Sequence, residues 1–353
     1  MEYDIRSEPV YGTMTADKTR LVPYNRESVL EAADILKCGG LVAIPTETVY
    51  GLAANALDEG AVKSIFRAKG RPQDNPLIVH IANMKMLPPL VKEIPGTAKR
   101  LAERFWGGPL TMIFPRSDKI PSITSGGLDT VAVRVPASKA ALDIIKYCGF
   151  PLAAPSANLS GKPSPTTAQH VFEDMNGRIP LIIDGGECTV GVESTVICFK
   201  DGRIHILRPG GVTAEMLSEF GEVEVDKAVT VQPDKDERVL SPGMKYKHYS
   251  PKADVYIVNA HGDKFLDYCS KRSRYEKKLL ALGAGVAEKG IFLDYGITAD
   301  IQAQRLFTFL RKADELGAET VLVEMPGKDG MGLAVYNRLL RAAAFRIIEV
   351  EDL

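Results

Sequence analysis

The chain has 353 residues, of which 45% are hydrophobic and 25% charged, a balance typical of a globular protein of two domains. Its formal net charge of −1 excludes a strongly basic protein, so any contact with nucleic acid needs a local patch. No apolar run could cross a bilayer, the N-terminus lacks a signal-peptide pattern, and the five cysteines form no CxxC pair, so we expect a cytoplasmic protein with reduced thiols.

A catalytic domain is predicted over 21–211, after a polar N-terminal arm at 1–20. Helices are predicted at 28–37, from Asp58 to Gly70, near 97–106 and near 140–147. Strands are predicted at 41–44, 77–81, 110–114, 130–135, 151–154, 180–183, 195–199 and 204–207. This alternation predicts an α/β domain with a mixed sheet.

The composition changes between 212 and 251, where acidic residues collect at 219–237 and no strand is predicted. We interpret 212–251 as a linker that ends in SPGMKYKHYSP at 241–251. Beyond it, a small βαβ, Rossmann-like domain is predicted over 252–353. Its strands are expected at 255–258, 279–282 and 320–323, and its helices include 299–316 and 334–345.

Motifs of several common enzyme classes are absent. The chain has no GxxxxGK[ST] phosphate loop, no GxSxG and no HExxH, and GAG at 283–285 lacks the full dinucleotide fingerprint. Polar residues instead gather where strands end. PTETVYGL at 45–52 places two threonines and a carboxylate at the end of a buried strand, the usual location of ligand contacts in an α/β sheet. Taken alone, this segment fits a strand-end turn equally well.

The segment KGRPQDNP at 69–76 has two cations just past a helix end. Its two prolines hold the residues before them, Arg71 and Asn75, in extended geometry. Lys69 alone could simply cap the helix. Together with Arg71 it could also form a rigid cationic fork for phosphates, each charge-assisted hydrogen bond contributing about 1.5–3 kcal/mol.

Other polar residues are ambiguous when they are taken singly. The Ser/Thr/Pro-rich segment at 153–167 can surround phosphates and ribose, or it can be a surface turn in which Thr166 caps the next helix. His80, Arg134 and Arg208 lie in apolar strands. Lone strand arginines usually face solvent, and such a histidine is more often a core or surface residue than a ligand contact.

A combination of motifs closely resembles the threonylcarbamoyl-AMP synthase family. These motifs are Lys69-x-Arg71, Ser156-x-Asn158, NPLIVH at 75–80, LRPGG at 207–211, and the segments 46–51 and 194–195. The resemblance covers 21–211, and the 241–251 motif with the small second domain resembles the long, two-domain form of the family. It implies a YrdC-like twisted mixed sheet with helices. It also implies a nucleotidyltransferase that condenses L-threonine, bicarbonate and ATP to threonylcarbamoyl-AMP and pyrophosphate for tRNA threonylcarbamoyladenosine modification.

The resemblance also implies roles for individual residues. The expected catalytic residues are Lys69, Arg71, Ser156 and Asn158. The expected threonine contacts are Thr48, His80, Arg134, the backbone of Ala154, and Ser194. The expected ATP contacts are Lys69, Arg71, Asn75, Thr130, Ser156, Asn158, Ser164, Arg208 and, from the linker, Tyr249. Mg²⁺ is expected to accompany ATP with no protein ligand assigned, and catalysis is expected to be positioning and charge neutralisation without a general base.

Several alternatives stay open at this level. The segment 241–251 can be a flap that keeps water from a labile intermediate, or a spacer. Hydrogenase-maturation carbamoyltransferases also contain a YrdC-type domain, but the zinc-finger-like cysteine motifs of that class are missing here. A non-catalytic RNA-binding module is the alternative from another class, with basic and aromatic residues at 245–252 and 271–275. A solvated helix face explains the second patch better. The resemblance adds tRNA and the tRNA threonylcarbamoyl-transfer proteins as candidate partners, and the sequence leaves open whether the protein binds tRNA directly or works alone.

Overall fold

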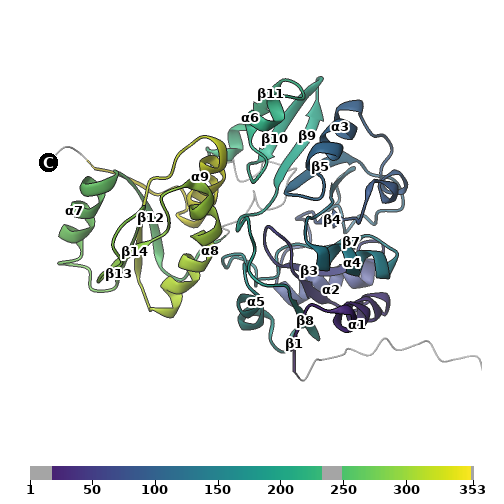
Figure 1. Ribbon diagram of the computed structural model, residues 1–353, viewed down its shortest axis with the longest axis horizontal. Coiled ribbons are helices and arrows are strands. Elements are labelled where there is room, and N and C mark those ends of the chain that lie inside the picture. Colours follow the sequence, from purple (N-terminus) through teal and green to yellow (C-terminus); the bar gives the residue numbers. More distant parts are fainter. Residues whose placement is uncertain (1–17, 233–248, 351–353) are drawn as a thin grey trace, which may run out of the picture.

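The computed structural model describes residues 18–232 and 249–350, which form two α/β domains (Figure 1). The first domain is built on an eleven-stranded sheet and the second on a five-stranded sheet. Helices α8 (Ala299–Glu315) and α9 (Gly330–Ala342) lie on the side of the second domain that faces the first (Figure 1). The predicted α/β class, with a mixed sheet followed by a smaller parallel one, is confirmed.

The large sheet is mixed and runs in the order β1-β8-β2-β3-β7-β4-β6-β5-β9-β10-β11. Its strands are β1 (Arg20–Pro23), β2 (Val42–Ile44), β3 (Gly51–Asn55), β4 (Ile78–His80), β5 (Leu110–Pro115), β6 (Thr130–Arg134), β7 (Leu152–Ala153), β8 (Leu181–Asp184), β9 (Thr195–Lys200), β10 (Arg203–Arg208) and β11 (Val223–Val225). The parallel strands β4 and β6 end together, His80 opposite Arg134, beside the starts of β5 and β9. Polar residues from four strands therefore meet at one edge.

Helices cover both faces of the large sheet. They are α1 (Arg26–Lys37), α2 (Glu59–Lys69), α3 (Gly96–Phe105), α4 (Lys139–Cys148), α5 (Ala168–Met175) and α6 (Ala214–Ser218), with short 3-10 helices η1 (Met84–Met86), η2 (Pro88–Leu90) and η3 (Lys227–Val229). Side chains alternate between faces along each strand. Val42 and Ile44 accordingly pack with α1 and α4, whereas Ala43 packs with the buried residues of α2 and α5.

Helix α2 brings Lys69 to the sheet edge, and its sequence fixes both of its ends. The Asp58 carboxylate accepts hydrogen bonds from the backbone N–H groups of Gly60 and Ala61, at 2.8 and 3.0 Å. At the other end Gly70 adopts a φ of +62°, a left-handed conformation that glycine reaches without strain and that stops the helix. Lys69 thus occupies the last helical turn and is 2% exposed.

The small sheet is entirely parallel, in the order β14-β13-β15-β12-β16. Its elements are β12 (Asp254–Asn259), α7 (Gly262–Arg272), β13 (Leu279–Gly283), β14 (Phe292–Asp294), α8, β15 (Thr320–Glu324), α9 and β16 (Ile347–Glu349). The apolar core between this sheet and helices α8 and α9 also includes Val49 and Val192 of the first domain. The two domains therefore share one continuous hydrophobic cluster.

The structure corrects the sequence prediction at several points. Strand β3 was not predicted, because its sequence GLAAN lacks the branched and aromatic residues typical of strands. Strand β11 lies in the 212–251 stretch, where no strand was expected, and extends the sheet edge beside β10. Thr19 and Arg20 belong to the folded domain rather than to the arm, since Thr19 Oγ1 donates to Ile179 O at 2.6 Å and β1 pairs with β8. Thr167, not Thr166, caps α5.

The structure describes only part of the predicted linker at 212–251. Residues 233–248, which include most of the 241–251 motif, lie outside the described residues. Tyr249 and Ser250 are described: Ser250 N–H donates to Gly161 O at 3.0 Å, and the Tyr249 ring contacts that of Phe307 with centroids 5.2 Å apart. The end of the linker thus packs between the two domains.

The N-cap of α2 gives a stability prediction. Replacing Asp58 with Ala should lower the free energy of unfolding by about 1 kcal/mol, because two N–H groups at the helix start lose their acceptor. Asp58→Asn keeps an acceptor oxygen and should lose less. Urea unfolding followed by circular dichroism measures both variants, and equal losses in the two would contradict this role for the cap.

Candidate active site

A solvent-connected pocket of about 750 Å³, including the space at its mouth, opens at the edge where β4, β6, β5 and β9 meet. Most of the residues predicted from the sequence line it: Thr48, Lys69, Arg71, His80, Arg134, Ala154, Ser156, Asn158, Ser194, Arg208 and Tyr249. The structure therefore brings together residues that are far apart in the chain.

Three predicted ATP contacts do not line this pocket. Ser164 is fully buried behind it, where its hydroxyl donates to Glu193 at 2.5 Å. Asn75 is 4% exposed and lies in the turn after α2. Thr130 begins strand β6, whose far end carries Arg134, so four residues of extended chain, about 13 Å, separate the two. Direct nucleotide contact by these three residues stays a prediction.

Arg134 is held in one orientation by the loop that follows β2. Its guanidinium donates to Glu47 Oε1 at 2.5 Å, to Thr48 Oγ1 at 2.9 Å and to Gly108 O at 3.2 Å. Glu47 is itself fixed, because its second oxygen accepts from the backbone N–H of Ala137 at 3.0 Å. A guanidinium has five N–H donors, and the three bonds leave further donors for an incoming carboxylate.

Lys69 lies deep in the pocket and binds the loop that follows β7. Its ammonium donates to the carbonyl oxygens of Ser156 and Asn158, at 2.5 and 2.6 Å. Ser156 Oγ in turn donates to Asn158 Oδ1 at 2.5 Å. Burial, together with the nearby charge of Arg71, lowers the pKa of Lys69 well below its usual value. A bound polyanion would favour the protonated form again.

Arg208 and Ser194 line the same pocket and contact each other. Arg208 donates to the carbonyl and to the hydroxyl of Ser194, at 3.1 and 3.2 Å, and the Ser194 hydroxyl also contacts that of Thr111 at 2.8 Å. Burial lowers the pKa of Arg208 to about 10. This value leaves the guanidinium charged at neutral pH.

His80 contributes a neutral imidazole to the pocket. It is 3% exposed, and burial together with the nearby Arg134 charge lowers its pKa to about 3. Within the described part of the chain its Nδ1 has no hydrogen-bond partner. A neutral histidine can accept or donate a hydrogen bond to a polar ligand without adding charge.

Glu47 and Glu193 are the acidic residues that the sequence analysis did not assign. Glu193 lines the pocket, and its Oε2 accepts from Arg338 Nε of helix α9 at 2.9 Å. Burial would raise the pKa of Glu193, but the charges of Arg338 and Arg208 and the bond from Ser164 lower it overall. The sequence signal for Glu193 is a carboxylate in the largely apolar run before β9. Its partner Arg338 lies 145 residues away, so the sequence does not indicate the ion pair.

The pocket as a whole is positively charged. Five cationic side chains, those of Lys69, Arg71, Arg134, Lys162 and Arg208, line it together with one carboxylate, Glu193, whose charge is already shared with Arg338. Outside the lining, Glu47 pairs with Arg134 and Asp174 pairs with Lys162. Hydroxyl groups and backbone stand between the cations. This arrangement can hold a phosphorylated ligand at one end and a carboxylate beside Arg134 at the other.

The fold and the pocket match one group of known proteins. A family model described as "Telomere recombination", which covers Sua5, YciO and YrdC proteins, matches residues 34–210, so the first domain is of the YrdC type. A second model, "Threonylcarbamoyl-AMP synthase, C-terminal domain", matches 212–344.

Individual relatives agree with these models. The chain is 48% identical to the threonylcarbamoyl-AMP synthase of Pyrococcus abyssi over 90% of this chain and 95% of that one. It is 42% identical to that of Bacillus subtilis, over 94% and 97%. The crystal structure of P. abyssi Sua5 complexed with L-threonine superposes with a TM-score of 0.89 at 45% identity, covering 94% of this chain and all of that one. The chain belongs to the threonylcarbamoyl-AMP synthase family, in its two-domain form, and is an enzyme.

The two basic patches considered for RNA binding differ in what can be said of them. The first, at 245–252, lies mostly outside the described residues. In the second, Lys271 pairs with Asp267 on helix α7, and Arg272, the last residue of that helix, pairs with Glu276 beyond it, so acidic neighbours neutralise much of its charge. Separately, none of the helices in the described ranges is long and apolar enough to cross a membrane.

The lowered pKa of His80 predicts a pH dependence of stability. In the unfolded chain the His80 imidazole binds a proton with a pKa near 6.5, whereas in the folded chain its pKa is about 3. The free energy of unfolding should therefore fall as the pH drops from about 6.5 toward 3, with a His80 contribution of at most about 1.4 kcal/mol per pH unit. Denaturant unfolding of wild type and His80→Gln between pH 4 and 7 isolates this term. Parallel curves for the two proteins would show that His80 titrates normally.

Proposed function

We propose that this protein is a threonylcarbamoyl-AMP synthase, a nucleotidyltransferase that makes threonylcarbamoyl-AMP and pyrophosphate from L-threonine, bicarbonate and ATP. The observation that supports this most directly is the pocket itself. Lys69 is bound to the Ser156-x-Asn158 loop at one end, and Arg134 is oriented by Thr48 and Glu47 at the other. One cationic end suits phosphates and the other suits an amino-acid carboxylate.

The proposed threonine subsite is centred on Arg134. In this proposal the guanidinium binds the threonine carboxylate with the donors not used by Glu47, Thr48 and Gly108. His80, Ser194 and the Ala154 backbone surround the same space and offer polar partners to the amine and the hydroxyl. A site built to bond the hydroxyl rejects analogues that lack it, because its own buried polar groups are then left unpaired. The P. abyssi relative was crystallised with L-threonine, which supports threonine as the amino acid in this proposal.

The proposed nucleotide subsite lies on the other side of the pocket. Lys69, Arg71 and Arg208 neutralise the phosphates, and Ser156, Asn158 and Tyr249 complete the wall. The two glutamates near the pocket are each paired with an arginine, and the described residues contain no cluster of three His, Cys, Asp or Glu side chains. The proposal therefore takes ATP as its Mg²⁺ complex, with the ion bound mainly by the phosphates, as is usual for Mg²⁺.

The chemistry proceeds in two proposed steps. The threonine amine attacks the carbon of bicarbonate and water leaves, which gives a carbamate. A carbamate oxygen then attacks the α-phosphorus of ATP, and the bond to the β-phosphate oxygen breaks to release pyrophosphate. No described side chain is required as a general base for the second step, because the carbamate is already an anion. The protein's contribution is alignment and neutralisation of developing phosphate charge.

The proposal also covers the setting of the enzyme. The product would supply tRNA threonylcarbamoyladenosine synthesis, with the tRNA threonylcarbamoyl-transfer proteins as partners. We place the protein in the cytoplasm, which agrees with its five cysteines being free thiols. The RNA-binding alternative gains no support from the ion-paired patch on α7.

Pyrophosphate release tests this function. It should require threonine, bicarbonate and ATP together, and Lys69→Ala should reduce kcat/KM at least 100-fold, because a buried cation beside the phosphates is lost. Lys63→Ala is the matched control, since Lys63 is on the same helix but is exposed and pairs with Glu59. Salt-sensitive RNA binding without any turnover would instead support the RNA-binding module.

A further inference from the structure

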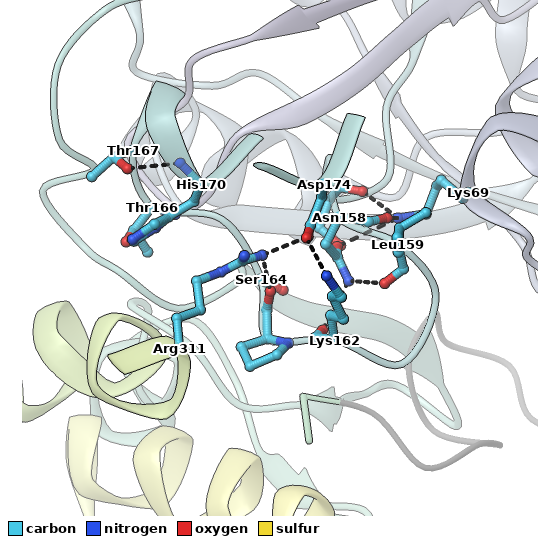
Figure 2. A network of polar contacts seen from close by, with 12 residues as sticks. Lys69, Asn158, Leu159, Lys162, Ser164, Thr166, Thr167, His170, Asp174 and Arg311 are labelled. Atoms are coloured by element: carbon cyan, nitrogen blue, oxygen red, sulfur yellow. Dashed lines mark hydrogen bonds and ion pairs between the residues drawn. The ribbon is translucent and has the colours of Figure 1, made fainter. Parts of the chain in front are cut away.

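The second domain contacts the first through a buried arginine near the pocket. Arg311 of helix α8 has a side chain that is 7% exposed and reaches into the first domain (Figure 2). Its Nη2 donates to the carboxylate of Asp174 on α5 at 2.8 Å and to the carbonyl of Pro163 at 2.6 Å. One cation of the second domain thus binds both a helix and a loop of the first.

Arg311 and Lys69 bind the same loop, residues 156–164. We refer to residues 156–164 as the 156–164 loop. Lys162 of this loop donates to the other oxygen of Asp174 at 2.8 Å, and its carbonyl accepts from Asn158 Nδ2 at 2.9 Å. Asn158 and Ser156 then provide the carbonyls that bind Lys69. Figure 2 shows this chain of contacts from Arg311 through Asp174 and Lys162 to Asn158 and Lys69.

Asp174 depends on this arrangement for its charge. Its side chain is completely buried. Burial alone would raise its pKa, but the bonds and charges of Arg311 and Lys162 lower it overall. Lys162 is the weaker partner because its side chain is 42% exposed to water. Without Arg311, a buried carboxylate would be left with one solvent-exposed partner, and the Pro163 carbonyl would lose its donor.

A second arginine of the same domain fixes the far end of the loop. Arg338 of α9 is completely buried and donates to the Glu193 carboxylate at 2.9 Å and to Pro209 O at 2.8 Å. Glu193 accepts from Ser164 Oγ, the last residue of the loop, at 2.5 Å. The 156–164 loop is therefore held between two arginines that both come from the second domain.

We propose that Arg311 and Arg338 are positioning residues for the nucleotide subsite, and that one role of the second domain is to hold the 156–164 loop in the conformation that places Lys69, Ser156 and Asn158. Neither arginine touches the reacting atoms in this proposal. This positioning role rests on the proposed function, because the experiment that tests it measures how the enzyme uses ATP. Among the described contacts Arg311 has no hydrogen bond to Arg134 or to the residues that bind Arg134, so the effect of Arg311 should be selective for ATP. Arg338 also donates to the carbonyl of Glu193, next to Ser194, at 3.2 Å, so this selectivity is expected of Arg311 alone.

Steady-state kinetics of the full-length protein tests the proposal. Arg311→Ala should raise the KM for ATP at least 10-fold while the KM for threonine changes less than 2-fold. Arg305→Ala is the matched control, because Arg305 is on the same helix, is half exposed, and among the described residues bonds to Asp294 of the second domain rather than to the first domain. Arg338→Ala should shift the KM for ATP in the same direction as Arg311→Ala.

Arg311→Lys separates positioning from simple stabilisation. The lysine keeps a positive charge for Asp174 but offers one ammonium in place of the guanidinium, so it should give a KM for ATP between those of wild type and Arg311→Ala. It is also the variant to use if Arg311→Ala does not fold, as judged by its melting temperature.

The outcomes are distinct. Equal rises in both KM values, or a KM for ATP in Arg311→Ala and Arg311→Lys equal to that of Arg305→Ala, would overturn the positioning role. If wild type and Arg305→Ala both fail to release pyrophosphate, the proposed function fails instead.

Discussion

Cationic side chains confined in a buried pocket are the constraint on which the rest of the structure depends. Lys69, Arg134 and Arg208 are each less than 7% exposed, and charges removed from water are costly unless acceptors surround them. The protein provides such acceptors to each of them. Carbonyls of the 156–164 loop bind Lys69, Glu47 and Thr48 bind Arg134, and Ser194 binds Arg208. These three side chains are thus held in position before any anion arrives, which is the preorganisation that electrostatic catalysis needs, and an anion that binds there favours the charged form of Lys69.

The same constraint explains why two domains are joined so closely. The first domain contributes buried carboxylates, Asp174 and Glu193, and the second contributes the arginines that neutralise them. Hydrophobic contact supports these ion pairs, because Val49 and Val192 of the first domain pack into the core formed by α8 and α9. The interface therefore combines buried nonpolar side chains with buried, hydrogen-bonded ion pairs. Both ion pairs contact the 156–164 loop, which lines the pocket.

Much of the site could be predicted from local sequence. Lys69 follows from a capped amphipathic helix that ends at Gly70, and Arg134 and His80 follow from strands whose ends are marked by the apolar pattern. Two strands of the large sheet could not be predicted, for local reasons. The Gly/Ala-rich β3 lacks a strand pattern, and β11 is a short edge strand in an acidic segment.

The partners of the buried charges could not be predicted in this way. Glu47 meets Arg134 across 87 residues, Asp174 meets Arg311 across 137, and Glu193 meets Arg338 across 145. Such pairs depend on the register of strands and on how the two domains dock, which hydrophobic periodicity does not encode. Sequence patterns therefore locate the side chains of the pocket, whereas their partners are set by the three-dimensional fold.

Identification of the reaction product tests the central claim most directly. The protein would be incubated with MgATP, ¹³C-bicarbonate and either L-threonine or another amino acid, and the adenylates separated and weighed by mass spectrometry. The account predicts a threonylcarbamoyl-AMP that carries one ¹³C and forms with threonine. An adenylate without the label, or AMP and pyrophosphate formed equally well when threonine and bicarbonate are omitted, would contradict it.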